Sequence, residues 1–191
     1  MQVDLRLNAI VDPERSGGRD LADLARLCAE GGATLVQLRD KLSGTRAMVA
    51  TARAIKLALA PFRVPFVVND RIDIALASSA DGVHVGQDDM AVEDARKLLG
   101  PDAIIGLSIK TVAEAEAAPV DLLDYVGSGG GLKDYRRPVG GRVWQDQKVF
   151  AEGCAPAADI STAKFQKINR PVEFICPAPG DYFSLTLIDC N

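Results

Sequence analysis

Residues 34–41 read Thr-Leu-Val-Gln-Leu-Arg-Asp-Lys, an apolar run that turns polar at its end. Three later segments have the same form, each a short apolar run followed by a polar tip: Phe66-Val67-Val68 before Asn69-Asp70, Val83-His84-Val85 before Gln87-Asp88-Asp89, and Ile104-Ile105-Gly106-Leu107 before Ser108. Helix-like segments separate these runs. In a parallel barrel the carboxyl ends of all strands open on one face, so we expect the four polar tips to converge there.

The alternation of strand and helix extends to both sides of this region. Strands are predicted over residues 7–12, 34–36, 65–68, 82–85 and 104–107, with a sixth beginning at 124. Asp20 and Thr45 are the expected N-caps of the first two helices, and later helices are predicted over 71–77, 92–99 and 111–118. Strands this apolar indicate a parallel sheet covered by helices. The predicted fold class is therefore α/β, of (β/α)8 TIM-barrel type, incomplete or atypical after the sixth strand.

The composition changes after Gly127. Residues 128–191 contain seven of the ten aromatic residues and three of the four cysteines, and the regular alternation stops. Only residues 171–175 and 183–188 have the character of strands there. We therefore expect a barrel portion over residues 1–127 and a divergent tail over 128–191.

Composition excludes several function classes. With 191 residues, 48% hydrophobic and 25% charged, the chain is expected to be a soluble globular protein. Its net charge of -4, without a basic stripe, argues against nucleic-acid binding. No long apolar run or signal peptide is visible, which predicts a cytoplasmic protein without membrane contact. A single histidine and no C-x-x-C pair argue against a zinc cluster.

A cationic tip follows the second predicted strand. Gln37, Arg39 and Lys41 alternate along the chain, so they project to one side if the strand conformation continues past Leu38. An arginine fork and a lysine charge suit a diphosphate. The alternative interpretation is a solvated strand end, since charged residues are common there.

Two carboxylates follow the third and fourth strands. Asp70 and Asp89 are expected to be neighbours on one rim, beside the amides of Asn69 and Gln87. Hard oxygen ligands of this kind suit Mg²⁺ bridged to a phosphate. The alternative is that Asp70 and Asp89 are N-caps of the helices that follow them.

His84 and Ser108 each have two interpretations. His84 lies between two strand valines, and a hydrogen-bonded interior histidine is favoured over direct catalysis. Ser108 suits a donor to a phosphate or to a departing oxygen, but serine at a strand-to-helix turn is also an ordinary cap. No Gly-x-Ser-x-Gly elbow surrounds it, which argues against a serine hydrolase.

Taken together, the four motifs resemble those of thiamine phosphate synthases and their thiazole tautomerase relatives, over about residues 7–127. The resemblance implies an eight-stranded barrel that joins an aminopyrimidine diphosphate to a thiazole phosphate in thiamine biosynthesis. It implies that Mg²⁺ binds Asp70 and Asp89 and that the catalytic residues are Arg39, Lys41 and Ser108. The pyrimidine diphosphate would be bound by Gln37, Leu38, Arg39, Asp40, Lys41, Asn69 and Ser108.

The implied chemistry agrees with this set of side chains. Diphosphate leaves, a pyrimidine cation forms, and the thiazole nitrogen captures it. Loss of diphosphate requires a metal ion and cationic side chains that favour negative charge on the leaving group.

The chain also departs from the family. The glycine-containing tips of the seventh and eighth strands, which bind the thiazole phosphate in the family, have no visible counterpart after Gly127. A non-catalytic relic or ligand-binding protein of the same fold is therefore the alternative. The tautomerase interpretation is weakened by Lys110, where relatives often have histidine, and by the joint presence of Asp70 and Asp89. Two open sheet edges after six strands also predict that the chain aggregates or associates, a homo-oligomer being one such outcome.

Overall fold

The computed structural model describes residues 3–128, 147–150 and 184–187. Strands and helices alternate through the first of these segments. The strands are β1 (Asn8–Val11), β2 (Leu35–Leu38), β3 (Phe66–Asn69), β4 (Gly82–Val85), β5 (Ile104–Ile109) and β6 (Tyr125–Ser128). The helices are α1 (Leu21–Glu30), α2 (Thr45–Leu59), α3 (Ile72–Ser78), α4 (Val92–Leu99) and α5 (Val112–Ala117), with 3-10 turns η1 (Ala60–Phe62) and η2 (Val120–Leu122). In this part of the chain no helix is both long and apolar enough to cross a bilayer.

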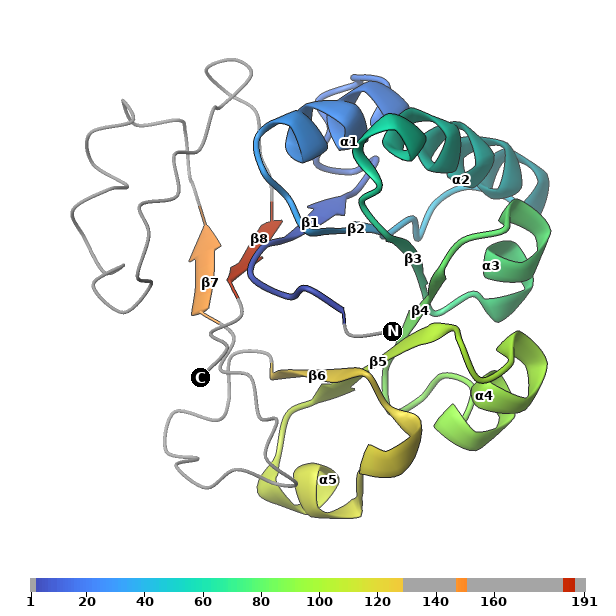
Figure 1. The fold of residues 1–191 in the computed structure, drawn as a ribbon, viewed down its shortest axis with the longest axis vertical. Helices are drawn as coiled ribbons and strands as arrows, with labels where there is room; N and C mark the ends of the chain where they lie inside the picture. Colours follow the sequence, from blue (N-terminus) through green and yellow to red (C-terminus); the bar gives the residue numbers. More distant parts are fainter. Residues whose placement is uncertain (1–2, 129–146, 151–183, 188–191) are drawn as a thin grey trace.

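The six strands form a curved parallel sheet with the helices on its outer side (Figure 1). Two further strands, β7 (Gln147–Phe150) and β8 (Ser184–Leu187), continue the sheet in the order β6-β5-β4-β3-β2-β1-β8-β7. β8 pairs antiparallel with β1, and β7 pairs antiparallel with β8. The prediction of a barrel-type α/β fold that becomes atypical after the sixth strand is confirmed.

The strand predictions for the tail have different outcomes. β8 lies inside the predicted segment 183–188, whereas β7 was not expected from the sequence. The other predicted strand, 171–175, lies outside the described residues. Because β8 pairs with β1, the outer edge of β1 is covered and is not an open sheet edge. The division into a barrel portion and a divergent tail stays a prediction.

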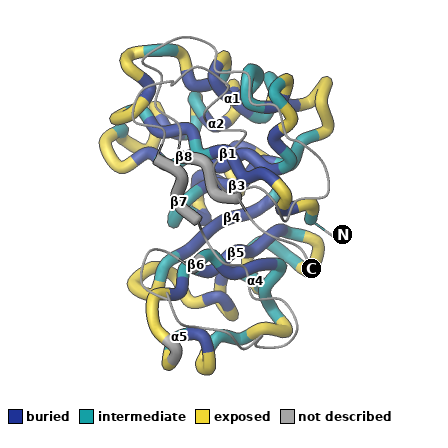
Figure 2. Tube along the Cα trace, turned by 90° about the vertical axis from the view of Figure 1, so that its left-hand side faces the viewer, coloured by how far each residue is buried: buried dark blue, intermediate teal, exposed yellow. Residues whose placement is uncertain are grey.

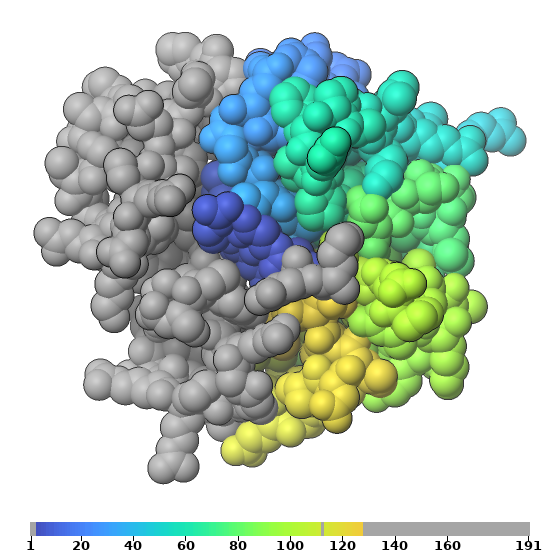
Figure 3. Space-filling view, in the orientation of Figure 1, coloured from blue at the N-terminus to red at the C-terminus, as the bar shows by residue number. Residues whose placement is uncertain are grey.

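Alternate residues of the strands face two different cores. The larger one lies between sheet and helices and includes Val36, Leu38, Val68 and Val83. The inner one contains Leu35, Val67, Ile104 and Tyr125, completed by Leu5 from the segment before β1. Figure 2 shows strands β1 to β6 as the most continuously buried part of the described chain, and Figure 3 shows the blue N-terminal segment near the centre of its view. The sheet is therefore apolar on both faces, as its sequence predicts.

The first two helix starts show which cap predictions hold. Asp20 caps α1, and its carboxylate accepts from the backbone N–H of Asp23 at 2.9 Å. The prediction that Thr45 caps the second helix is wrong, because the N-cap of α2 is Gly44. The Thr45 hydroxyl instead accepts from the Arg71 guanidinium at 3.0 Å. A partner 26 residues away thus determines the role of this side chain.

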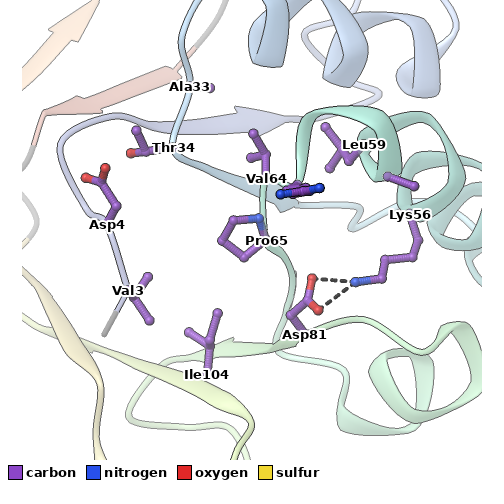
Figure 4. A pocket seen from close by; sticks show the side chains of 12 residues that line it. Val3, Asp4, Ala33, Thr34, Lys56, Leu59, Val64, Pro65, Asp81 and Ile104 are labelled. Carbon is purple, nitrogen blue, oxygen red and sulfur yellow. Dashed lines mark hydrogen bonds and ion pairs between the residues drawn. The ribbon is translucent and has the colours of Figure 1, made fainter. Parts of the chain in front are cut away.

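A pocket of about 540 Å³ opens at the amino-terminal ends of the strands (Figure 4). Thr34, Pro65 and Ile104, which precede or begin β2, β3 and β5, line it together with Asp81. The Lys56 ammonium contacts both carboxylate oxygens of Asp81 at 2.6 Å, and Asp81 also accepts from the backbone N–H of Phe66 at 2.8 Å. This pocket lies at the opposite ends of the strands from the four polar tips. In TIM barrels the active site lies at the carboxyl ends of the strands, whereas residues at the amino ends contribute to stability.

Replacing Gly82 with alanine is expected to destabilise the protein strongly. A Cβ at this position would lie 1.8 Å from the backbone oxygen of Ile104, on the paired strand β5. Neither backbone can move without breaking the β4–β5 ladder, so we expect the free energy of unfolding to fall by about 3 kcal/mol or more. Urea unfolding of G82A measures this change. G44A is the matched control because nothing lies within 4 Å of a Cβ there, and loss of the glycine N-cap should cost less than about 1 kcal/mol. Equal midpoints for the two variants would contradict the packing account.

Candidate functional site

Asp70 directly follows the carboxyl end of β3 in an unusual backbone conformation. Its φ is +63°, in the left-handed region, and its backbone N–H donates to the carbonyl of His84 at 2.8 Å. The following helix α3 begins at Ile72 with Arg71 as N-cap and without a side-chain cap. The alternative that Asp70 is the helix cap is therefore wrong, and its carboxylate is available for other contacts. Strain of this kind in a non-glycine residue is often found at functional sites.

Asp89 lies in the turn after β4. One carboxylate oxygen accepts from the backbone N–H of Gly86 at 2.7 Å, which closes the turn. The next helix α4 has Ala91 as its N-cap, so the capping alternative for Asp89 is also wrong. Asp89 is an exposed residue, and its carboxylate also interacts with that of Asp70.

The two carboxylates meet at the rim formed by β3 and β4. Burial raises the pKa of Asp70, the Asp89 carboxylate within hydrogen-bonding reach raises it further, and only Lys41 opposes the rise. Two negative groups in one partly buried place repel each other, and a divalent cation between them would remove this cost. Among the described residues, no group of three or more histidine, cysteine, aspartate or glutamate side chains could hold a metal. The carboxylates of Asp70 and Asp89 are hard oxygen ligands of the kind that divalent cations prefer.

The two cations of the second strand tip contact different acidic partners. The Lys41 ammonium contacts the Asp70 carboxylate, while the Arg39 guanidinium donates to Asp12 at 2.6 Å. Gln37, Arg39 and Lys41 were expected to project to one side if the strand continued past Leu38. Because β2 ends at Leu38, this condition is not met. Arg39 thus contacts the residue that follows β1, and Lys41 contacts the residue that follows β3, so both cations lie at the carboxyl ends of the strands. Asp12, only 3% exposed in its side chain, was missed by the sequence analysis.

Three amide side chains form a diagonal row across the inner face of the sheet, offset by two residues from each strand to the next. Asn8 on β1 donates to the Gln37 oxygen at 3.5 Å, and Gln37 donates to the Asn69 oxygen on β3 at 2.8 Å. Gln37 is buried, so its polar group is held by these neighbours. The Asn8 side-chain oxygen is buried and has no hydrogen-bond partner within the described segments. Asn8 was not expected as a site residue from the sequence, although an asparagine in an apolar strand is a visible signal.

Leu38 and Asp40 are placed differently from the rest of their motif. Leu38 is fully buried in the core between sheet and helices, so its side chain points away from the inner face. Asp40 accepts from the backbone N–H groups of Leu42 and Ser43 at 3.0 and 2.9 Å. Burial would raise the pKa of Asp40, but these hydrogen bonds outweigh it and lower the pKa. The contacts of Asp40 shape the loop that carries Lys41.

A buried hydrogen-bonded network joins β4, β5 and β6. The His84 ring contacts the Ser108 hydroxyl through Nε2 at 2.8 Å and the Tyr125 hydroxyl through Nδ1 at 3.0 Å. Burial lowers the pKa of His84 to about 4, so the ring is neutral at physiological pH. The prediction of a hydrogen-bonded interior histidine agrees with this geometry. Tyr125 was missed, because a tyrosine in an apolar strand resembles an ordinary core residue.

Ser108 lies inside β5 and does not cap the next helix, whose N-cap is Thr111. The Gln87 amide donates to the Ser108 carbonyl at 2.7 Å, which fixes the loop after β4 against β5.

The four polar tips found in the sequence lie together at the carboxyl ends of β2 to β5, because these strands are parallel neighbours. The expectation of convergence is met by the geometry of these residues.

Comparison with known proteins identifies matches over the same part of the chain. The family model described as thiamine monophosphate synthase matches residues 7–136. A thiamine-phosphate synthase of Agrobacterium fabrum is 50% identical over 129 residues, covering 68% of this chain and 59% of the relative. One of Xanthobacter autotrophicus is 48% identical over 126 residues, covering 66% of this chain and 60% of the relative.

A solved structure is also similar. The thiamine phosphate pyrophosphorylase from Pyrococcus furiosus superposes with a TM-score of 0.58 at 33% sequence identity, covering 71% of this chain and 63% of that one. The chain spans about three fifths of the length of the curated relatives it matches.

Proposed function

The chain belongs to the thiamine monophosphate synthase family, and from this premise we propose that it is a Mg²⁺-dependent transferase of thiamine biosynthesis. It joins 4-amino-2-methyl-5-(diphosphooxymethyl)pyrimidine to thiazole phosphate and releases diphosphate. The observation that carries the proposal is the meeting of the Asp70 and Asp89 carboxylates beside the Lys41 ammonium. Two carboxylates and an ammonium group at the carboxyl ends of neighbouring strands suit the binding of a divalent metal ion with a diphosphate. Neither carboxylate is the N-cap of the helix that follows it.

Asp70 and Asp89 would hold the Mg²⁺ ion. When bound, the ion neutralises negative charge on the phosphate oxygens and makes diphosphate a better leaving group. The electrostatics of Asp70 support this role. Burial and the Asp89 carboxylate raise the pKa of Asp70, which means that its negative charge is unfavourable in this place, and a bound cation would stabilise it.

The remaining side chains bind the substrate and stabilise the charges of the reaction. Arg39 and Lys41 flank the diphosphate and favour the negative charge that develops as the carbon–oxygen bond breaks. The electron pair of that bond leaves with the diphosphate, and the thiazole nitrogen then forms a carbon–nitrogen bond with the pyrimidine cation. The amides of Gln37 and Asn69 orient the pyrimidine, and the Ser108 hydroxyl donates to an oxygen of the departing group. Leu38 and Asp40 support the tip from the core and the loop.

The activity is tested by incubating the full chain with both substrates and Mg²⁺ and following thiamine phosphate by chromatography. We expect thiamine phosphate and diphosphate to appear in equal amounts, and chelation of Mg²⁺ to stop both. If the chain binds the pyrimidine diphosphate but forms no product, the transferase proposal fails and a ligand-binding protein of the same fold remains.

We also propose a cytoplasmic location and association into a homo-oligomer. Support for association comes from β6, which ends the sheet on one side in the strand order. Light scattering after size-exclusion chromatography measures the mass. A monodisperse monomer that unfolds cooperatively would contradict association.

A further inference from the structure

We propose that His84 and Tyr125 act as positioning residues. They orient the Ser108 hydroxyl so that it donates a hydrogen bond to a ligand bound at the inner face of the sheet. The proposal concerns the direction of two hydrogen bonds in the network Tyr125–His84–Ser108. It rests on the proposed function only for the identity of the group that Ser108 contacts. The direction of the bonds follows from the donors and acceptors of the three side chains.

The buried end of the network determines the direction. The Tyr125 side chain is buried, and within the described residues His84 Nδ1 is the hydroxyl's one hydrogen-bond partner. If Nδ1 carried the proton, it would donate to the tyrosine oxygen, and the tyrosine O–H would have no acceptor among the described residues. A buried donor without a partner costs free energy. Tyr125 therefore donates to Nδ1.

The rest of the network follows from this first bond. A ring nitrogen that accepts a hydrogen bond carries no proton, so the one proton of the His84 imidazole must lie on Nε2. Nε2–H donates to the Ser108 oxygen across 2.8 Å. The serine oxygen accepts this bond, so its own proton is not used within the network. Since Ser108 is only partly buried, that proton can point toward a bound ligand.

Two glycines make room for the network. A Cβ at Gly106 would lie 2.2 Å from the Tyr125 ring and 2.6 Å from His84 Nδ1. A Cβ at Gly127 would lie 3.2 Å from His84 Cε1. Larger residues at these two positions would displace the imidazole from one or both hydroxyls. The absence of side chains at Gly106 on β5 and Gly127 on β6 thus leaves space for the His84 ring between the hydroxyls of Ser108 and Tyr125.

The tautomer can be measured directly because the chain contains one histidine. Selective ¹⁵N labelling of histidine gives a single pair of ring nitrogen signals, which need no assignment between residues. We expect a protonated Nε2 and an unprotonated Nδ1 in the wild type, and a mixture of tautomers in Tyr125→Phe. A protonated Nδ1 in the wild-type protein would overturn the proposal. This readout does not depend on catalysis, so it also tests the proposal in a chain that makes no thiamine phosphate.

A matched pair of variants tests the effect on the reaction. Glutamine and methionine have similar size, but only glutamine has an N–H that can replace Nε2–H. We expect His84→Met to lower kcat at least about tenfold, with little change in the KM for the pyrimidine diphosphate. His84→Gln should retain most of the activity. Equal activity of the two variants would overturn the proposal.

A double-mutant cycle separates positioning from a general structural role. Tyr125→Phe should lower kcat in the wild-type background and have no further effect when Ser108 is already alanine. If Tyr125→Phe lowers kcat by the same factor in both backgrounds, the tyrosine does not act through Ser108 and the proposal fails. An inverted tautomer in an active transferase would remove this inference and leave the proposed function intact.

Discussion

Replacing Asp70 with asparagine is expected to lower kcat/KM by at least about a hundredfold and at the same time to stabilise the metal-free protein. Asparagine tolerates the left-handed backbone conformation of this position, so the variant should keep the local fold. The loss of activity follows from the loss of one carboxylate of the pair that would hold Mg²⁺.

The gain in stability follows from the pKa of Asp70. Its pKa in the folded protein is raised by burial and by Asp89. A raised carboxyl pKa means that the folded state binds more protons than the unfolded state, so stability falls as pH rises from the ordinary aspartate pKa through the raised one. Above that range the ionised carboxylate destabilises the protein by a constant amount. An uncharged amide at position 70 removes this cost.

The measurements are steady-state kinetics and urea unfolding at neutral pH without metal. Asp88→Asn is the matched control, because Asp88 is exposed, lies beside Asp89 and has no hydrogen bond or ion pair among the described residues. We expect the control to change neither quantity. An active D70N, or a D70N that is inactive because it is unfolded, would contradict the account.

Replacing Lys41 with methionine is expected to change the affinities for diphosphate and for Mg²⁺ in opposite directions. The Lys41 ammonium contacts the Asp70 carboxylate, so it competes with any cation that binds there. It is also expected to bind the diphosphate of the substrate. Without it, affinity for inorganic diphosphate should fall about tenfold to a hundredfold, the range for a charge-assisted hydrogen bond. Affinity for Mg²⁺ alone should rise.

Calorimetric titration of K41M with Mg²⁺ and then with diphosphate measures both effects. Lys97→Met is the control for general loss of a positive charge, because Lys97 is exposed and pairs with Asp94 on its own helix. A parallel decrease of both affinities in K41M would indicate a damaged fold rather than a displaced competitor. Unchanged diphosphate affinity would show that Lys41 does not bind this ligand.

The fold up to β6 is largely readable from the sequence because its signals are local. The helix predicted over 92–99 and the strand over 82–85 have the same bounds in the structure. The cap of α2 could not be predicted, since the partner of Thr45 is Arg71 in another unit. β7 has the same limitation, because its pairing with β8 joins residues far apart in sequence.

The candidate site is only partly readable from the sequence. Asp70 and Asp89 follow apolar strands, so their place at the rim can be inferred from strand direction alone. Asn8 and Tyr125 begin apolar strands that are buried on both faces, so the sequence alone does not show which face lies on the inside of the curved sheet. Asp12 was missed for a related reason, since its importance depends on its ion pair with Arg39, which follows the neighbouring strand β2.

The central claim is that Asp70 and Asp89 hold one divalent ion beside the diphosphate site. Crystals of the protein grown with Mn²⁺ and inorganic diphosphate test it most directly, because manganese gives an anomalous signal. The account predicts one peak at about 2.0–2.3 Å from a carboxylate oxygen of each residue, with diphosphate next to Arg39 and Lys41. A manganese peak elsewhere, or diphosphate bound at the opposite ends of the strands near Lys56 and Asp81, would contradict it.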